Sequence, residues 1–346
     1  MPGMGGMGGR PELTGSTAFS QWMFSPVVTA ALLVIAALYG WGVLRSVRRR
    51  GRSWPAIRVG SFAAGLVVVA IATQSSIGVY ERELFWVHMI QHLLLIMLAP
   101  ALLVTGRPWM LLLHTGSPAV HRVTKRALRS APVSLLTHPV VAAAIYTVTV
   151  LITHLTGFMD MLMSSTAAHG GEQLLYLVAG YLYFLPVFGD EPIRWRLSHP
   201  MKIALLVVSM PVDTFTGVAL MQSNAPRFGM SLTDIHNGGA VMWIGGDFLM
   251  FVAILVVFAF WAQHDTARGA ARRGWMEAAR ASVFTERAAS LTAGSGSTGA
   301  AESAGSLAGS RAASRPPDLD NDDEQLVAYN SWLAKINGGE RPTPKS

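Results

Sequence analysis

Apolar residues gather along this chain in long runs that short polar stretches separate. An α-helix needs roughly 20 residues to cross a bilayer. The runs lie at residues 26–44, 59–77, 84–104, 140–155, 174–188, 203–221 and 239–261. The fourth and fifth are the shortest, and we expect them to extend back to Pro139 and to about Ala168. The pattern predicts an all-α, polytopic membrane helical bundle of about seven transmembrane helices.

Basic residues concentrate in alternate connections between these runs. Arginine and lysine follow helices one, three, five and seven, whereas the connections after helices two, four and six hold Arg82, no basic residue, and Arg227. Loops rich in Lys and Arg stay in the cytoplasm of bacterial membrane proteins. The charge distribution therefore predicts an N-terminus outside and a C-terminus inside.

Three regions follow from composition. Residues 1–24 form an external Gly/Met-rich tail without the basic and apolar segments of a signal peptide. Residues 25–262 form the membrane domain. Residues 263–346 are rich in Ala, Gly and Ser and end in an acidic patch, which predicts a largely disordered cytoplasmic tail. Within this tail, residues 324–336 could form a short amphipathic helix, and disorder fits them equally well.

Composition narrows the function classes. Charged residues make up 14% of the chain, against about 25% in soluble proteins. The net charge of +7 comes from basic residues beside apolar runs, where they set topology, so we expect no nucleic-acid partner. Neither a phosphate-binding loop nor a nucleophile elbow is present, and we expect no enzyme activity. With no cysteine in the chain, a site for a soft metal must use Met and His.

Five of the ten histidines map to the outer third of the predicted bundle. His88 and His92 lie in the first half of helix three, and their four-residue spacing places both imidazoles on one helix face. His154 ends helix four, His169 opens helix five, and His236 precedes helix seven. The five imidazoles are therefore candidate metal ligands near the extracytoplasmic surface, although each could also be a structural or interfacial histidine.

Other polar and sulfur-containing residues lie at the same depth. Asp160, Glu172 and Asp234 are placed to orient imidazoles around a metal. Met1, Met4 and Met7 in the external tail could capture an ion, or could be incidental in a flexible start. Thioethers combined with imidazoles suit Cu(I). Asp213, within helix six, is a separate intramembrane carboxylate to which we assign no role.

Several segments resemble one known family. Residues 88–108 (HMIQHLLLIMLAPALLVTGRP) join His-x-x-Gln-His to an Ala-Pro helix break and a Gly-x-Pro turn. The segments THP, THLTGFMD and DIHNGGAVMWIGGD follow in order at residues 137–139, 153–160 and 234–247. Together they resemble the CtaG family of cytochrome c oxidase assembly proteins, which is associated with caa-type oxidases. The resemblance covers roughly residues 60–262.

The resemblance implies a multi-pass protein of the bacterial plasma membrane that helps deliver copper to the oxidase, with oxidase subunits or other copper chaperones as partners. The family's histidines correspond to His88, His92, His154 and His169. His236 departs from the pattern, because many members have Asp-Gln before the Gly-Gly segment.

Two alternatives remain open at this point. One is a b-type haem cytochrome, in which His92 and His154 on facing helices would ligate haem. The other is a structural membrane subunit whose histidines only pack.

Overall fold

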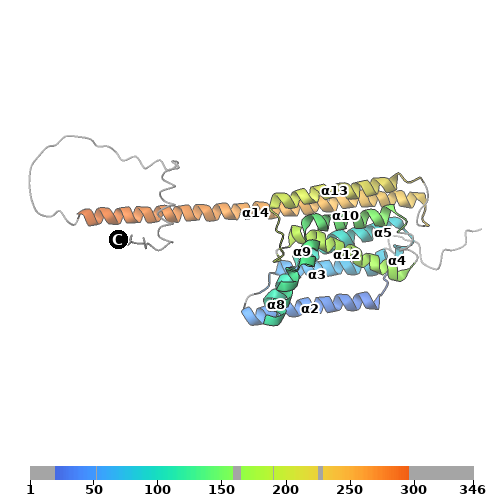
Figure 1. Ribbon diagram of the computed structural model, residues 1–346, viewed down its shortest axis with the longest axis horizontal. Coiled ribbons are helices and arrows are strands. Elements are labelled where there is room, and N and C mark those ends of the chain that lie inside the picture. Colours follow the sequence, from blue (N-terminus) through green and yellow to red (C-terminus); the bar gives the residue numbers. More distant parts are fainter. Residues whose placement is uncertain (1–19, 52, 159–164, 190, 225–228, 296–346) are drawn as a thin grey trace, which may run out of the picture. The chain divides into compact units, whose positions relative to one another are not determined.

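The computed structural model describes residues 20–295 except 52, 159–164, 190 and 225–228. Every regular element in this part of the chain is a helix, and it contains no strand. The chain divides into two compact units, residues 1–260 and 261–346. The helices of the first unit are shown in Figure 1.

The long helices follow the predicted apolar runs, and α7, α8 and α9 lie between two of them. The elements are α2 (Pro26–Arg50), α3 (Ala56–Gln74), α4 (Ser76–Tyr80), α5 (Phe85–Leu93), the π-helix η1 (Leu94–Leu98), α6 (Ala99–Thr105), α7 (Pro108–Thr115), α8 (Pro118–Leu128), α9 (Ala131–Leu136), α10 (Pro139–Leu155), α12 (Thr166–Phe188), α13 (His199–Met221) and α14 (Leu232–Ser295).

Five helical stretches are long and apolar enough to cross a membrane. They are Pro26–Arg48, Ala56–Tyr80, Phe85–Thr115, His199–Met221 and Leu232–Gln263. Helix α10 is a shorter apolar helix. An all-helical membrane protein is thus confirmed, and the count of seven spans with the N-terminus outside stays a prediction.

Local sequence sets several helix boundaries. The side chains of Ser117 and Ser165 accept hydrogen bonds from the first turns of α8 and α12, which satisfies amide groups that have no partner within the helix. The His138 side chain does the same for α10, where Pro139 follows it at the first helical position. Gly51 ends α2 with φ of 62°, in the left-handed region that glycine tolerates.

The third span is interrupted in the middle by η1. Pro100 follows this π-helical turn, and a proline cannot donate the amide hydrogen bond that a regular helix would direct to the carbonyl of Ile96. Gly180 of α12 packs directly on that carbonyl, because a Cβ atom added there would collide with the Ile96 oxygen. The irregular turn and the glycine together bring α12 close to η1 and α6.

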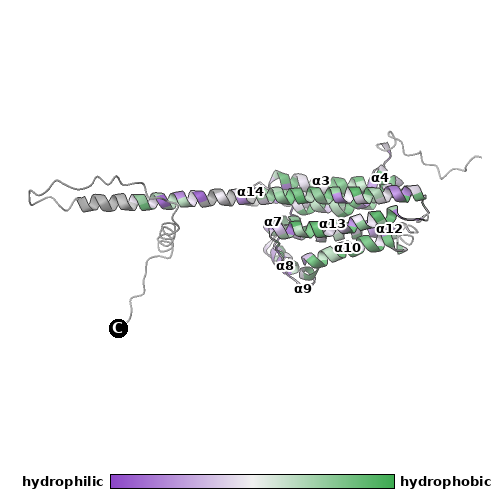
Figure 2. Cartoon of the chain, turned by 90° about the horizontal axis from the view of Figure 1, so that it is seen from above, coloured by the Kyte–Doolittle hydropathy of each residue, from purple (hydrophilic) through white to green (hydrophobic). Residues whose placement is uncertain are grey.

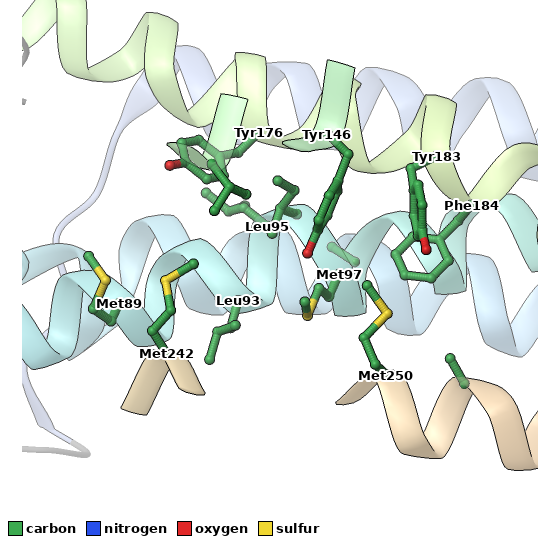
Figure 3. Close-up of a cluster of buried hydrophobic side chains, with 14 of the residues drawn as sticks. Met89, Leu93, Leu95, Met97, Tyr146, Tyr176, Tyr183, Phe184, Met242 and Met250 are labelled. Carbon is green, nitrogen blue, oxygen red and sulfur yellow. The ribbon is translucent and has the colours of Figure 1, made fainter. Parts of the chain in front are cut away.

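The core lies between α5, η1, α10, α12, α13 and the first part of α14. Figure 3 shows Tyr146, Tyr176 and Tyr183 near the α5–η1 segment, with Met242 and Met250 of α14 on its other side. Helices α13 and α14 pack closely at two glycines, since a Cβ on Gly217 would lie 2.6 Å from the carbonyl oxygen of Gly239.

Helix α2 contacts the bundle through one side only. Tyr39 stacks on Phe62 with ring centroids 3.9 Å apart, whereas Val27, Leu33 and Leu38 are more than 60% exposed. Figure 2 shows hydrophobic colour along much of the helices of the first unit. Apolar side chains exposed on such helices are expected to face lipid.

Only the first part of the second unit, up to Ser295, lies within the described residues. Residues 263–346 were expected to be largely disordered, but α14 continues to Ser295. The extension is rich in alanine, which has the highest helix propensity of all residues and here outweighs Gly269 and Gly274. The possible helix at 324–336 lies outside the described residues.

Candidate metal centre

His88 and His92 lie one turn apart on α5, with ring centroids 4.1 Å apart. Their relative exposures are 0% and 1%. Neither ring nitrogen of His88 has a hydrogen-bond partner among the described residues, and the same holds for Nε2 of His92. Ring nitrogens buried without a partner in this way are unusual in proteins.

Glu172 reaches the same point from the second turn of α12. Its Oε1 atom lies 3.5 Å from Nε2 of His92, and among the described residues it accepts no hydrogen bond. One ligand atom from each of His88, His92 and Glu172 lies within 4.8 Å of the other two. This buried group of two imidazoles and one carboxylate could hold a metal ion.

His154 of α10 determines which ring nitrogen of His92 carries the proton. Its Nδ1 lies 2.8 Å from the carbonyl oxygen of Val150, which can only accept, so this nitrogen carries a proton. A neutral His154 then has a lone pair on Nε2, which accepts from Nδ1–H of His92 over 3.0 Å. It follows that Nε2 of His92 has a free lone pair directed towards Glu172, as a metal ligand requires.

His169 lies beside the group but engages two carboxylates. Its Nδ1 is 3.1 Å from Oε2 of Glu172, and its Nε2 is 2.7 Å from Oε1 of Glu81. Gln173 also contacts Nε2 of His169, at 3.1 Å. Because both nitrogens of His169 are occupied, this residue orients Glu172 rather than offering a lone pair of its own.

Aromatic rings enclose the centre. Tyr176 stacks on His92 with centroids 4.1 Å apart, and Phe85 lies 6.3 Å from the ring of His88. The Tyr176 hydroxyl is in close hydrogen-bond contact with Thr153. A buried polar atom without a partner costs about 1–3 kcal/mol, and a cation bound between these atoms would remove that cost.

The structure brings four of the five predicted histidines together and separates the fifth. Nε2 of His236 lies 2.9 Å from the carbonyl oxygen of Ser223, and among the described residues no hydrogen bond or ring contact links His236 to the centre. Asp234 accepts from the backbone amides of Phe85 and Trp86, at 2.6 and 3.4 Å, so it caps α5 instead of contacting an imidazole. Asp160, Met1, Met4 and Met7 lie outside the described residues.

Glu81 is the residue that sequence reasoning missed. It lies in the Glu-Arg-Glu turn at residues 81–83, which resembles an ordinary charged connection, yet it is only 3% exposed. The one available signal was a carboxylate directly before a helix that carries two histidines. Gln91, between those histidines, instead donates to the carbonyl of Ala72 on α3, at 2.8 Å.

Asp213 belongs to a different buried polar group. The hydroxyl of Tyr146 donates to its two carboxylate oxygens, at 3.2 and 3.1 Å. Nearby, Thr214 donates to Asp247 of α14, at 3.1 Å. These bonds join α10, α13 and α14, which gives Asp213 a role in helix packing.

Comparison with known proteins identifies the family of this chain. Residues 37–264 match the family described as cytochrome c oxidase caa3 assembly factor. Uncharacterised proteins of Mycobacterium bovis and Mycobacterium tuberculosis are each 30% identical to this chain over 263 residues, and one of Mycobacterium leprae is 29% identical over 266. The alignments cover 70–71% of this chain and 40% of each relative.

The chain therefore spans about two fifths of the length of these relatives. No solved structure matches it. The family match covers nearly all of the membrane unit, including α5, α10 and α12 with the buried histidines. The protein belongs to the cytochrome c oxidase caa3 assembly factor family and is a multi-pass protein of the bacterial membrane.

Proposed function

We propose that this protein binds copper at His88, His92 and Glu172, near the extracytoplasmic face, and passes it to the copper centres of cytochrome c oxidase. The observation that carries the proposal is the set of buried ligand atoms without hydrogen bonds, all within 4.8 Å of one another. The role is that of a non-enzymatic assembly factor, with oxidase subunits or other copper chaperones as partners.

The ligand set is consistent with copper as cargo. Imidazole nitrogens bind copper in both oxidation states, and copper forms the most stable complexes among the divalent first-row metals. Thioethers combined with imidazoles favour Cu(I), whereas the carboxylate of Glu172 favours Cu(II). The centre contains no thiolate, since the chain has no cysteine, and a site without thiolate can release its metal to an acceptor more readily.

The haem alternative conflicts with the geometry of the same residues. His92 and His154 would have to lie on opposite faces of a porphyrin. Their ring nitrogens are instead in direct hydrogen-bond contact at 3.0 Å, which leaves no room for a macrocycle. An absorption spectrum of the purified protein should therefore lack a Soret band.

Metal analysis of the purified full-length protein tests the proposal. After incubation with copper and removal of excess ion, the wild type should retain about one copper per chain, as expected for one three-ligand site. The double variant His88→Ala/His92→Ala should lose this copper. The matched control is His236→Ala, which removes an imidazole outside the centre and should retain the wild-type copper content.

A second experiment tests delivery in cells. Deleting the gene should yield an oxidase that lacks copper, and excess copper in the medium should restore part of its activity. A fully metallated oxidase in the deletion strain would refute copper delivery. Equal copper content in the wild type and in a well-folded His88→Ala/His92→Ala protein would refute the proposed site.

A further inference from the structure

Helix α8 is divided lengthwise into an apolar half and a cationic half. At 100° per residue, one half carries Val120, Val123, Thr124, Ala127 and Leu128. The other half carries His121, Arg122, Lys125 and Arg126, and Arg129 directly follows the helix. Such a division is typical of helices that lie in the plane of a membrane surface.

Only part of the apolar half packs against the protein. Thr124 and Leu128 are buried, at 8% and 7% exposure, whereas Val123 is 69% exposed. Ala127, one turn after Val123, is also exposed. On the adjoining α9, Leu135 is 61% exposed. The exposed apolar side chains therefore continue from one short helix to the next.

Among the described residues, the cationic half of α8 has no acidic partner. His121, Arg122, Lys125, Arg126, Arg129 and Ser130 line a shallow concave surface of about 570 Å³. Residues 84–159 contain no Asp or Glu, and within the described residues no acidic group pairs with these four cations. Mutual repulsion among uncompensated positive charges favours binding of an anion.

The position of α8 is consistent with a location at the membrane surface. Figures 1 and 2 place α8 and α9 together at one end of the bundle, and α4 lies at the opposite end. Helix α8 also crosses the direction of the long helices in Figure 1. A helix at this level meets the headgroup layer rather than the hydrocarbon core.

We propose that α8 is a binding surface for anionic phospholipids. Val123 and Ala127 insert at the boundary of the acyl chains, and Arg122, Lys125, Arg126 and Arg129 bind headgroup phosphates. Each basic residue near an anionic surface adds to the attraction, and the uninterrupted cationic stripe places four of them within three turns of helix. This surface is separate from the histidine centre and does not depend on copper binding.

Hydrogen exchange of the full-length protein in lipid nanodiscs tests this inference. The comparison is between discs of phosphatidylcholine alone and discs that also contain about 30 mol% phosphatidylglycerol, which supplies an anionic surface. Peptides covering residues 118–129 should exchange about fivefold more slowly in the anionic discs, and about 0.5 M NaCl should remove most of the difference by screening.

Two triple variants, each of which removes three positive charges, test whether the protection depends on the cations of α8 or on positive charge in general. Arg122→Gln/Lys125→Gln/Arg126→Gln should abolish the protection at residues 118–129. The matched control Arg48→Gln/Arg194→Gln/Arg196→Gln changes three basic residues outside α8 and should keep it. A third variant, Val123→Asp, leaves every α8 cation in place and should weaken the protection by opposing insertion.

Several outcomes would overturn the inference. These are equal exchange in neutral and anionic discs, equal loss in the two triple variants, or full protection from inorganic phosphate added to neutral discs, which would identify a site for free phosphate. A Tm of the α8 triple variant equal to that of the wild type shows that its membrane fold is intact.

Discussion

At the scale of single residues, His92 has one ring nitrogen available because the other is bonded to His154. The carbonyl of Val150 holds the proton on Nδ1 of His154, and the remaining bonds follow from that constraint. The histidines of the centre therefore have different roles. His88 and His92 are the proposed metal ligands, His154 sets the tautomer of His92, and His169 contacts Glu172.

Replacing Glu81 by Gln tests whether the hydrogen bonds from Glu81 through His169 to Glu172 support metal binding. Glu81 accepts from Nε2 of His169 at 2.7 Å, and His169 in turn contacts Glu172. Residues that orient metal ligands typically affect metal affinity by about 10- to 100-fold. We therefore expect Glu81→Gln to weaken copper binding about tenfold, measured by competition with a chelator of known affinity.

Glu83→Gln is the matched control for this measurement. Glu83 lies in the same turn but is exposed, so its replacement should leave the affinity unchanged. If Glu81→Gln bound copper as tightly as the wild type, or if both variants lost the same affinity, Glu81 would have no orienting role.

Sequence reasoning found the histidines of this centre but not the bonds between them. Membrane depth, which hydropathy and loop charge reveal, placed His88, His92, His154 and His169 at one level. The directions of the side chains depend on how α5, α10 and α12 are rotated against one another, and no spacing within one helix determines that rotation. For this reason the buried Glu81 was missed and His236 was included.

At the scale of elements, the irregular third span explains how α5 and α12 come close enough to share a centre. The apolar run at 84–104 predicted one span, but it did not predict the π-helical turn within it. A helix with such a turn presents its side chains at a changed angle beyond it. Gly180 fits against the Ile96 carbonyl at this turn, so the contact depends on two segments far apart in sequence.

The variant Gly180→Ala should destabilise the protein by forcing α12 away from η1. Overpacking a close contact costs about 1–3 kcal/mol, so we expect a lower Tm and also weaker copper binding, because Glu172 is on the same helix. The matched control is Gly170→Ala, since a Cβ at Gly170 meets nothing within 4 Å and alanine favours a helix by about 0.5–1 kcal/mol. A Tm for Gly180→Ala equal to that of Gly170→Ala would show that the close packing is not required.

At the scale of the whole molecule, hydropathy predicted the helical membrane character of the chain because it reflects the bilayer itself, whereas the seven spans and the orientation derived from loop charge stay predictions. The continuation of α14 to Ser295 was not predicted, since Ala-, Gly- and Ser-rich composition is compatible with both disorder and a helix. The two proposed ligand sites lie towards opposite ends of the membrane unit, with the buried copper centre at α5 and α12 and the surface for anionic lipid at α8. Their functions depend on which end faces the cytoplasm.

Cysteine accessibility can decide this orientation directly, because the chain contains no cysteine of its own. Ser53, in the basic connection after α2, and Thr233, at the start of α14, are both exposed, so a thiol at either position can be reached by reagent. With the N-terminus outside, a membrane-impermeant maleimide should label Thr233→Cys in intact cells and Ser53→Cys only after permeabilisation. The reverse pattern would place the histidine centre on the cytoplasmic side, where it could not supply an extracytoplasmic copper centre, even if the purified protein bound copper as expected.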